Sequence, residues 1–467
     1  IPVFTSILVF LCMSYHSLIE KYNVPIPRYT SYPTVPYWQD NKTDNEDWML
    51  QIQKSIHAGK TKEGISLYIH LPFCEQLCTY CGCNKRITKN HHVETIYIDY
   101  LLKEWKHYKA VFGNGLVIRE LHLGGGTPTF FSPENLKNFL TELFKDVTIH
   151  PEREFSFEGH PNNTTYEHLH TLFGLGFRRV SYGVQDLNIK VQTAINRIQP
   201  YEKTKQATEW ARAIGYESVN FDLIYGLPFQ TKESIGQTIQ SVIELKPNRI
   251  AFYSYAHVPW TKKSQRAYDE NDLPKGNEKF ELYELGKTLL VNAGYTDVGM
   301  DHFALEGDAL LVSKNNGTLH RNFMGYTTTN TEVLIGLGVS AISDVYYGYR
   351  QNLKTVEEYY EALDKNSLPI HRGINLSEED ILYRKHILNI ACKGKTDWKN
   401  EFELTEKMRD QLEDLQKDGL ITRENTILEV TALGWSFLRN ICAVFDKKMN
   451  DTITDSPQGT PKFSQAV

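Results

Sequence analysis

The sequence predicts an α/β protein: an open partial (β/α)6 TIM-like barrel with an N-terminal segment and a small, mostly helical C-terminal domain. Between residues 66 and 256, short β-branched or aromatic runs alternate with amphipathic stretches. This pattern is typical of a parallel sheet with helices outside it. The alternation gives six strand–helix units, and no second set of strands is expected to return to the sheet. Six units favour an open barrel over a closed eight-stranded one.

The six expected strands are short apolar runs, and the helices between them are amphipathic. The strands are Ser66–Phe73, Glu120–Leu123, Glu154–Glu158, Arg179–Val184, Ser218–Ile224 and Arg249–Ser254. The helices are Val93–Phe112, Pro133–Phe144, Tyr166–Leu175, Glu202–Ile214 and Lys232–Leu245. Pro133 and Thr164 are the residue types expected where a helix begins.

After Ala256 the strand–helix repeat stops. Tyr295–Phe303 and Ala309–Val312 are interpreted as added strands, and the small apolar residues 336–342 suit close packing against a ligand or another backbone. From about Lys354 the composition shifts to helix formers.

The C-terminal region is expected to hold helices followed by a hairpin. Ser377 stands at an expected helix start, Arg409–Gly419 is a helix ending at glycine, and Ile421–Thr431 is a hairpin. This order predicts a small winged-helix-like domain with the role of a lid or scaffold rather than DNA binding, because its charge is mixed.

These changes in composition and in the strand–helix pattern divide the chain into five segments. They are an over-extended start (1–12), an N-terminal segment (13–60), the barrel with additions (61–350), the winged-helix-like domain (351–446) and a tail (447–467). The first residue is Ile, and residues 1–13 are apolar but too short to span a bilayer and lack the basic region of a signal peptide. Met13 is therefore the expected start.

Composition limits the function classes. With a net charge of −6 and no basic stripe, the chain is not expected to bind nucleic acid. A few local cations still allow a small anionic substrate. The seven cysteines, four of them clustered, suit reduced thiols in the cytoplasm rather than disulfides, and no membrane association is expected.

The densest chemical signal is a cysteine cluster, Cys74-x3-Cys78-x2-Cys81-x-Cys83, directly after the first strand. A structural zinc site needs two separated cysteine pairs, which this chain lacks. An iron–sulfur cluster takes thiolates from one short loop. Three of these cysteines can reach three corners of a cubane and leave one iron free for cofactor or substrate chemistry, so an iron–sulfur cluster is the favoured interpretation.

Polar or small residues lie within or just after different expected strands. They are Tyr68, Gly125, Glu158, Gln185, Asp222 and Ala256. Because the carboxyl ends of parallel strands form the active-site face, we expect these residues to line one rim. Gly124-Gly-Gly-Thr-Pro128 is a glycine-rich turn that lets backbone approach a ligand closely, without the spacing of a dinucleotide motif.

The segment His70-Leu-Pro-Phe-Cys-Glu-Gln-Leu-Cys-Thr-Tyr-Cys-Gly-Cys-Asn-Lys85 resembles the cluster loop of radical S-adenosylmethionine enzymes. Its fourth cysteine narrows the resemblance to the oxygen-independent coproporphyrinogen III oxidases, because the related haem-chaperone branch usually has phenylalanine where Cys83 stands. Residues 24–34 and 319–328 are similar to further segments of the same family, so the resemblance runs from about Met13 to Asp446.

The resemblance implies a [4Fe–4S] cluster on Cys74, Cys78 and Cys81, with S-adenosylmethionine on the open iron. Two molecules of S-adenosylmethionine are implied. Residues implied to contact them are Tyr68, Tyr80, Gly125, Gly126, Thr127, Glu158, Gln185, Arg197, Asp222 and Ala256, with Ile342 at a second site. Met324 stands where some relatives have glutamine, which puts the second site in doubt.

The implied activity is that of an oxidoreductase in haem biosynthesis. A 5′-deoxyadenosyl radical would start the oxidative decarboxylation of two propionates of coproporphyrinogen III, giving the vinyl groups of protoporphyrinogen IX. A haem-binding chaperone of the same fold and a radical enzyme acting on another tetrapyrrole are the alternatives. The electron donor is unidentified, and a monomer is expected.

A protein of charge −6 has to hold a tetra-anionic substrate with local cations. Arg28 and Arg321 are the candidates because both lie in family-like segments away from the cysteines. The alternative is that each pairs with an acidic neighbour and only shapes the fold. Cys83 either lines the substrate cavity or is an inert thiol.

Overall fold

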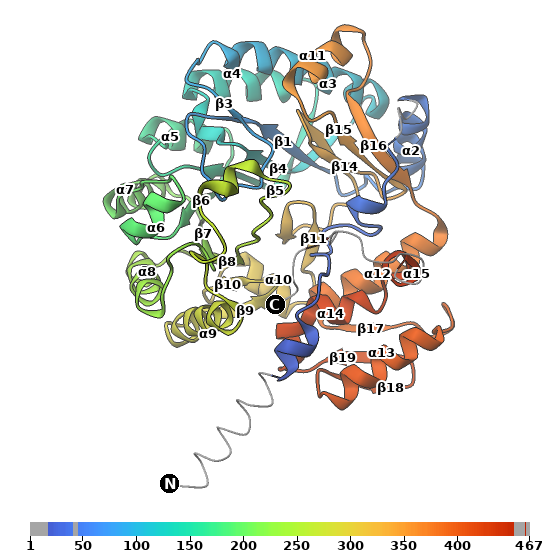
Figure 1. The fold of residues 1–467 in the computed structure, drawn as a ribbon. Coiled ribbons are helices and arrows are strands. Elements are labelled where there is room, and N and C mark those ends of the chain that lie inside the picture. The colour runs from blue at the N-terminus through green and yellow to red at the C-terminus, as the bar shows by residue number, and fades with distance from the viewer. Residues whose placement is uncertain (1–16, 41–44, 453–462, 464–467) are drawn as a thin grey trace. The chain divides into compact units, whose positions relative to one another are not determined.

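The computed structural model describes residues 17–40, 45–452 and 463, and the prediction that the chain begins at Met13 lies outside them. The chain divides into two compact units. The larger, called the barrel unit here, comprises residues 39–312 and 328–376, and the smaller comprises residues 1–38, 313–327 and 377–467. Figure 1 shows the helices and strands of both.

Six parallel strands form the centre of the barrel unit, as predicted. In spatial order they are β1 (Ile65–Leu71), β4 (Val117–Gly125), β5 (Thr148–Gly159), β6 (Arg179–Gln185), β7 (Ser218–Tyr225) and β8 (Arg249–Ser254). Each adjacent pair runs parallel. This confirms the open partial (β/α)6 barrel.

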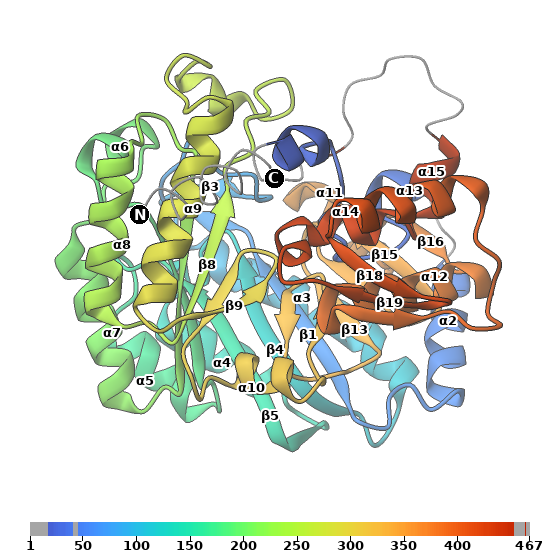
Figure 2. The same ribbon diagram turned by 90° about the horizontal axis from the view of Figure 1, so that it is seen from below.

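The helices that follow these strands lie on their outer side (Figure 1). They are α3 (Val93–Phe112), α4 (Pro133–Leu143), α5 (Tyr166–Gly174), α6 (Ile189–Ala194), α7 (Tyr201–Ile214) and α8 (Lys232–Leu245). Figure 2 shows α5, α7 and α8 along the outside of the strands. The helix ends follow local capping, since the Ser132 side chain accepts from Asn135 N and begins α4.

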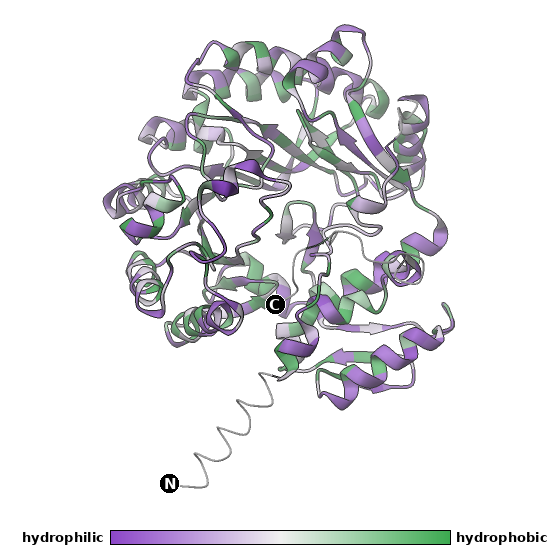
Figure 3. Cartoon of the chain, in the orientation of Figure 1, coloured by the Kyte–Doolittle hydropathy of each residue, from purple (hydrophilic) through white to green (hydrophobic). Residues whose placement is uncertain are grey.

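The core of the barrel unit lies between the strands and the inner faces of these helices. Leu67, Ile69 and Leu121 on the strands and Trp105 on α3 are buried. Along the helices in Figure 3, hydrophobic and hydrophilic segments alternate, as expected of helices with one buried face. Burial of this apolar face gives each helix its position against the sheet.

The sheet continues beyond the six strands at both edges, and the strands at the β1 edge were not predicted from the sequence. At the β1 edge the sheet continues through β13 (Leu334–Leu337), which is parallel to β1, and then through antiparallel strands. The antiparallel strands are β14 (Ile342–Asp344), β15 (Gly348–Asn352) and β16 (Ile370–Asn375). These strands are only three to six residues long, and β13, β15 and β16 each contain a glycine, which lowers their preference for extended structure. Gly336 also allows close packing, because a Cβ on it would lie 2.5 Å from Ile342 O.

At the β8 edge, the structure confirms one of the two expected additions. β9 (Thr296–Gly299) and β10 (His302–Ala304) extend the sheet, as predicted. Ala309–Val312 is not a strand but part of helix α10 (Ala309–Asn315). Asp308 explains the difference, because its side chain accepts from Leu310 N at 2.8 Å and so begins a helix.

The smaller unit contains the predicted helices and hairpin. Its C-terminal part holds α12 (Glu378–Lys393), β17 (Lys395–Asp397), α13 (Glu406–Lys417), the hairpin strands β18 (Ile421–Glu424) and β19 (Ile427–Val430), α14 (Leu438–Ala443) and α15 (Lys447–Thr452). Ser377 caps α12, as predicted. The β-ribbon of β11 (His320–Asn322) and β12 (Gly325–Thr327) belongs to the same unit.

The division between the two units falls at Leu376 and Ser377 rather than at residue 351. β15, β16 and the intervening helix α11 (Val356–Asp364) therefore belong with the barrel. Within the described part of the chain, no helix combines the length and apolar character needed to cross a bilayer.

Candidate active site

The cysteine cluster lies on a loop whose two ends are tied together by strand pairing. Cys74 ends the two-residue strand β2 (Phe73–Cys74), which pairs with β3 (Arg86–Ile87). Arg86 N donates to Pro72 O at 2.8 Å and Thr88 N donates to Cys74 O at 2.9 Å. The loop body is also anchored, because Thr79 N donates to Ile195 O at 3.0 Å. The thiols are thus presented by a loop of fixed path.

All four cysteines of the loop line one cavity of about 770 Å³, and Cys74, Cys78 and Cys81 have different neighbours. Cys74 Sγ is 3.3 Å from Thr127 Oγ1, and Arg197 Nη1 donates to Cys78 Sγ at 3.5 Å. The hydrogen bond with Cys83, with the ammonium of Lys85 close by, lowers the pKa of Cys81 to about 6. Burial raises the pKa of Cys74 to about 11. Cys81 therefore favours the thiolate form that metals bind.

The thiols do not form a site for a single metal ion. Among the described residues, no three His, Cys, Asp or Glu side chains are arranged to hold one ion. A zinc site would require such convergence. A [4Fe–4S] cluster instead takes each thiolate on a different iron, so its thiolates do not converge on one point.

The predicted polar rim is largely brought together around the same cavity. Its lining includes Tyr80, Gly125, Gly126, Thr127, Glu158, Gln185, Arg197 and Asp222 as well as Cys83. Most of them come from the carboxyl ends of β4, β5 and β6 or from the loops that follow. The carboxyl edge of the parallel strands, where the sequence predicts the site, is therefore the edge that holds the cavity.

Two carboxylates in the cavity have different surroundings. Glu158 Oε2 accepts from Gly125 N at 3.2 Å. Asp222 accepts from Ser181 Oγ at 3.0 Å and from Asn220 Nδ2 at 2.9 Å. Burial and the charge of Glu158 raise the pKa of Asp222 to about 6. Both side chains offer acceptor oxygens that suit hydroxyl or ammonium groups.

Two rim residues, Gly126 and Gln185, have constrained backbone positions. A Cβ on Gly126 would lie 2.5 Å from Pro72 O, so only glycine lets the β4 turn approach the cysteine loop this closely. Gln185 has φ of 65°, a left-handed conformation that is uncommon for a residue with a side chain. Such local strain is frequent in binding sites.

Three predicted cofactor contacts lie in the barrel unit outside the cavity lining. Tyr68 OH is 3.1 Å from His70 Nδ1, and its ring stacks on His122. Ala256 O accepts from Gln265 Nε2, which also donates to Tyr80 O. Ile342 begins β14 and lies against Gly336. Their roles stay predictions.

Several cavity residues were missed by the sequence reasoning. They are His160, Asn162, Asn163, Asn196, Lys85, Lys89 and Tyr253. The segment His160-Pro-Asn-Asn163 directly follows β5, and this position after a strand is the sequence feature that could have identified it as part of the site. Burial, with Arg197 nearby, holds the pKa of His160 well below its usual value, so it is a neutral donor or acceptor at the rim.

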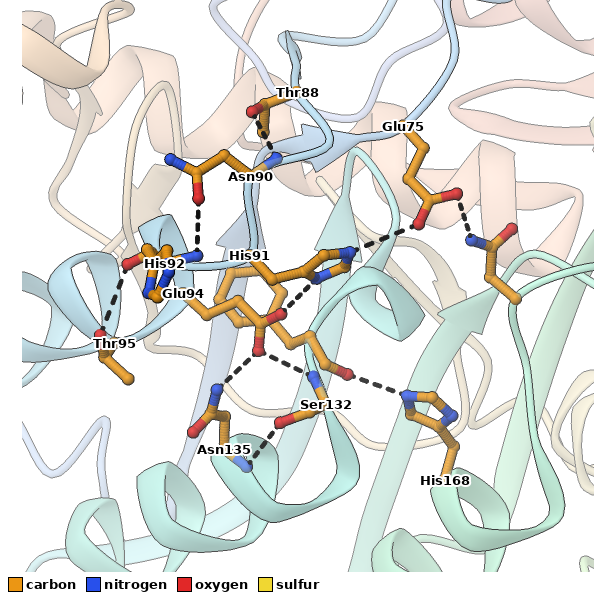
Figure 4. Close-up of polar contacts among 12 residues, drawn as sticks. Glu75, Thr88, Asn90, His91, His92, Glu94, Thr95, Ser132, Asn135 and His168 are labelled. Carbon is orange, nitrogen blue, oxygen red and sulfur yellow. Dashed lines mark hydrogen bonds and ion pairs between the residues drawn. The ribbon is translucent and has the colours of Figure 1, made fainter.

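A polar network ties the cysteine loop to α3 and α4 (Figure 4). His91 lies between Glu75, which follows Cys74, and the buried Glu94 of α3. Its Nδ1 is 2.7 Å from Glu94 Oε1, its Nε2 is 3.5 Å from Glu75 Oε1, and its ring stacks on Phe130. The other oxygen of Glu94 accepts from Ser132 N at 2.8 Å.

We expect Glu94→Ala to lower the free energy of unfolding by about 3 kcal/mol, because it removes a buried carboxylate that accepts from several donors. Those donors are the partly buried Ser132 N and Asn135 Nδ2 and the exposed imidazole of His91. Urea unfolding followed by circular dichroism measures this. Glu94→Gln keeps an acceptor oxygen and should lose less, and the exposed Glu134→Ala is the matched control. Equal stabilities of Glu94→Ala and Glu134→Ala would contradict the network.

The two arginines predicted to bind substrate lie in the smaller unit. Arg321 is 5% exposed, its Nη2 donates to Arg28 O at 3.1 Å, and its guanidinium lies over the Tyr326 ring. Its Nε and Nη1 have no partner among the described residues, and no carboxylate there forms an ion pair with it. Arg321 and Arg384 line a small cavity of about 10 Å³ together with residues 29–32.

The acidic partner that would make Arg321 purely structural is therefore not found in the described part of the chain. A buried guanidinium without a counter-charge is costly unless an anion or polar group approaches it.

Met324, which stands where some relatives have glutamine, donates its backbone N–H to Asn322 Oδ1 at 2.8 Å.

A partial parallel barrel that presents cysteine thiols at the carboxyl edge of its strands defines, as a class, a barrel enzyme that binds an iron–sulfur cluster. The Radical SAM superfamily matches residues 68–242, which run from β1 into α8 and include the cysteine loop and most of the rim.

Comparison with individual proteins narrows the class. Oxygen-independent coproporphyrinogen III oxidase from Helicobacter pylori strain J99 is 38% identical over 437 residues, covering 91% of this chain and 95% of that protein. The protein of the same description from Salmonella typhimurium strain LT2 is 39% identical, with coverage of 92% and 94%. The solved structure of coproporphyrinogen III oxidase (HemN) from Escherichia coli matches with a TM-score of 0.85 and 36% identity, covering 90% of this chain and 97% of that one. The chain belongs to the oxygen-independent coproporphyrinogen III oxidase family.

Proposed function

We propose that the protein catalyses the oxygen-independent oxidative decarboxylation of two propionates of coproporphyrinogen III, giving protoporphyrinogen IX in haem biosynthesis. One observation carries the proposal: three cysteine thiols and the polar ends of neighbouring parallel strands line a single cavity. Membership of a family whose relatives carry this activity in their names supports the choice of substrate.

The donor set suits the [4Fe–4S] cluster that the family implies. Cys74, Cys78 and Cys81 would hold it, and a fourth iron would stay free for S-adenosylmethionine. When bound, the cluster and S-adenosylmethionine together supply a carbon-centred radical that abstracts hydrogen. The chain's own contribution is to bind, orient and exclude water.

The rim residues have chemistry that suits S-adenosylmethionine. Arg197 presents a guanidinium beside Cys78, where it can bind a carboxylate. Glu158 and Asp222 offer acceptors for the ammonium and ribose hydroxyls, while Gly125 and Gly126 let the backbone come close. Tyr68, Tyr80, Gln185, Thr127 and Ala256 would complete this site, and Ile342 would contact a second molecule.

The direct test is turnover under anaerobic conditions. Reconstituted protein with coproporphyrinogen III, S-adenosylmethionine and a reductant should release protoporphyrinogen IX, detected by chromatography after oxidation. Haem binding without turnover would instead identify a chaperone, and turnover of a different tetrapyrrole would identify a divergent enzyme. An electron donor of unknown identity, a monomeric state and a cytoplasmic location remain predictions.

Arg321 and Arg28 are proposed to hold propionates of the substrate. We expect Arg321→Ala to weaken substrate binding by about 1.5–3 kcal/mol, or roughly 10- to 150-fold in Kd, because a charge-assisted hydrogen bond is lost. Arg28→Ala should have a similar effect. Fluorescence titration with coproporphyrin III measures the change, while iron content and uncoupled cleavage of S-adenosylmethionine should stay the same.

Arg409→Ala is the matched control, since it removes an exposed arginine of the same unit. Arg321→Lys keeps the charge without the planar fork and should give an intermediate Kd. Unchanged affinity in both alanine variants, with the fold intact, would show that the propionates are held elsewhere.

A further inference from the structure

Three basic side chains from distant segments of the barrel unit gather beside the end of the cysteine loop. They are Lys262, just before the short helix η3 (Lys263–Ala267), Lys354, just after β15, and Arg372 of β16. None of them lines the cavity described above. Together they are called the basic patch here.

Hydrogen bonds fix the position of Lys354 relative to the cysteine loop. Asn84, which directly follows Cys83, donates its Nδ2 to Lys354 O at 2.9 Å. The carbonyl of Asn84 is itself 2.8 Å from His70 Nε2, so the link continues to the end of β1. Lys354 therefore stands directly beside the point where the cysteine loop ends.

The other two cations are fixed by neighbouring contacts. Gln351 and Arg372 face each other across β15 and β16, and Arg372 Nε donates to Gln351 Oε1 at 2.8 Å. On the other side, Gln265 of η3 donates to Tyr80 O at 3.1 Å and so holds the segment carrying Lys262 against the cysteine loop.

The positive charges of Lys262, Lys354 and Arg372 repel one another. Partial burial, followed by the charge of Arg372, lowers the pKa of Lys354, and Lys262 contributes to the same shift. Asp40 acts in the opposite direction at Lys354 and Arg372, and its carboxylate lies 3.9 Å from His371 Nε2. Glu358 also faces His371. Three cations with two nearby acids leave positive charge in excess, and no described carboxylate forms an ion pair with Lys262 or Lys354.

We propose that Lys262, Lys354 and Arg372 form a carboxylate-binding patch that holds propionate groups of the tetrapyrrole while another propionate lies in the cavity. This rests on the proposed function, since a substrate with four propionates can present carboxylates to both places. An anion at the patch would relieve the repulsion among the cations, and their side chains are at least partly exposed to receive it. The patch would thereby help to choose which propionate lies beside the thiols.

The test compares two triple variants of the full-length, anaerobically reconstituted protein. In the patch variant Lys262, Lys354 and Arg372 are replaced by alanine. The control variant carries Lys137→Ala, Lys203→Ala and Lys232→Ala, which remove the same charge from exposed positions on the outer helices. Coproporphyrin III, a fluorescent four-carboxylate relative of the substrate, is the probe.

The patch variant is expected to bind the probe about 100-fold more weakly than the unchanged protein, with the control within about 3-fold. The dependence of Kd on salt should also flatten in the patch variant only, because fewer charged contacts are screened. Iron content and the affinity for S-adenosylmethionine should be unchanged.

Equal probe affinity in the two triple variants would overturn the proposal, and so would a loss confined to S-adenosylmethionine binding, which would assign the patch to the cofactor. Failure of the proposed function has a different signature: the unchanged protein would bind the probe but not convert coproporphyrinogen III. In that case the comparison of probe affinity between the patch variant and the control variant would still test the basic patch. No binding of the probe by the unchanged protein would overturn both.

Discussion

Replacing Cys78 by alanine is expected to remove most of the bound iron and all reductive cleavage of S-adenosylmethionine. Cys78 faces the cavity and is the cysteine whose sulfur accepts from Arg197. A cubane held by three thiolates on one loop loses a corner when any one of them is removed. The same result is expected for Cys74→Ala and Cys81→Ala, measured by iron analysis, visible absorption and release of 5′-deoxyadenosine.

Cys83→Ala is the informative control for this result. Cys83 lines the same cavity but is not one of the three cysteines assigned to the cluster, so we expect the cluster to persist while porphyrinogen conversion falls. Iron loss from Cys83→Ala would show that it is a ligand. A full cluster retained in Cys78→Ala would refute the assignment of the three ligands.

Exposure to air is expected to abolish activity. A cluster with one iron lacking a protein ligand, at the wall of a cavity of about 770 Å³, can be reached by oxygen through the same opening that admits the substrate. Protein reconstituted without oxygen and then stirred in air should lose its visible absorption and its turnover together, and a second anaerobic reconstitution should restore both. Sustained turnover in air-saturated buffer without a reductant would contradict the radical mechanism.

The sequence was sufficient for the parts of the fold that repeat. Strand and helix periodicity located the six parallel strands, and the Cys74–Cys83 spacing located the loop at their carboxyl edge. Periodicity was insufficient for the edge strands, because β13 and β14 are only four and three residues long, too short to show an alternating pattern. It was misleading for 309–312, where the capping side chain of Asp308 outweighs the β-preference of Val312.

The residues of the candidate site also fall into two groups: those whose position the sequence predicts and those whose position it does not. Side chains at strand ends, such as Glu158 and Asp222, could be placed because position along a parallel strand fixes the edge where they emerge. The burial of Arg321 could not be predicted, because it depends on packing among segments far apart in the chain. The basic patch could not be predicted from the sequence for the same reason. Lys262 and Lys354 are 92 residues apart in the chain, and the folding of η3, β15 and β16 brings the three side chains together.

The closure of the cysteine loop by β2 and β3 bears on what fixes the positions of its thiols. Backbone hydrogen bonds to Pro72 O, Cys74 O and Ile195 O hold both ends of the loop and Thr79 within it. Pairing within the polypeptide therefore contributes to the path of the loop, in contrast to a zinc finger, where the ion itself drives folding.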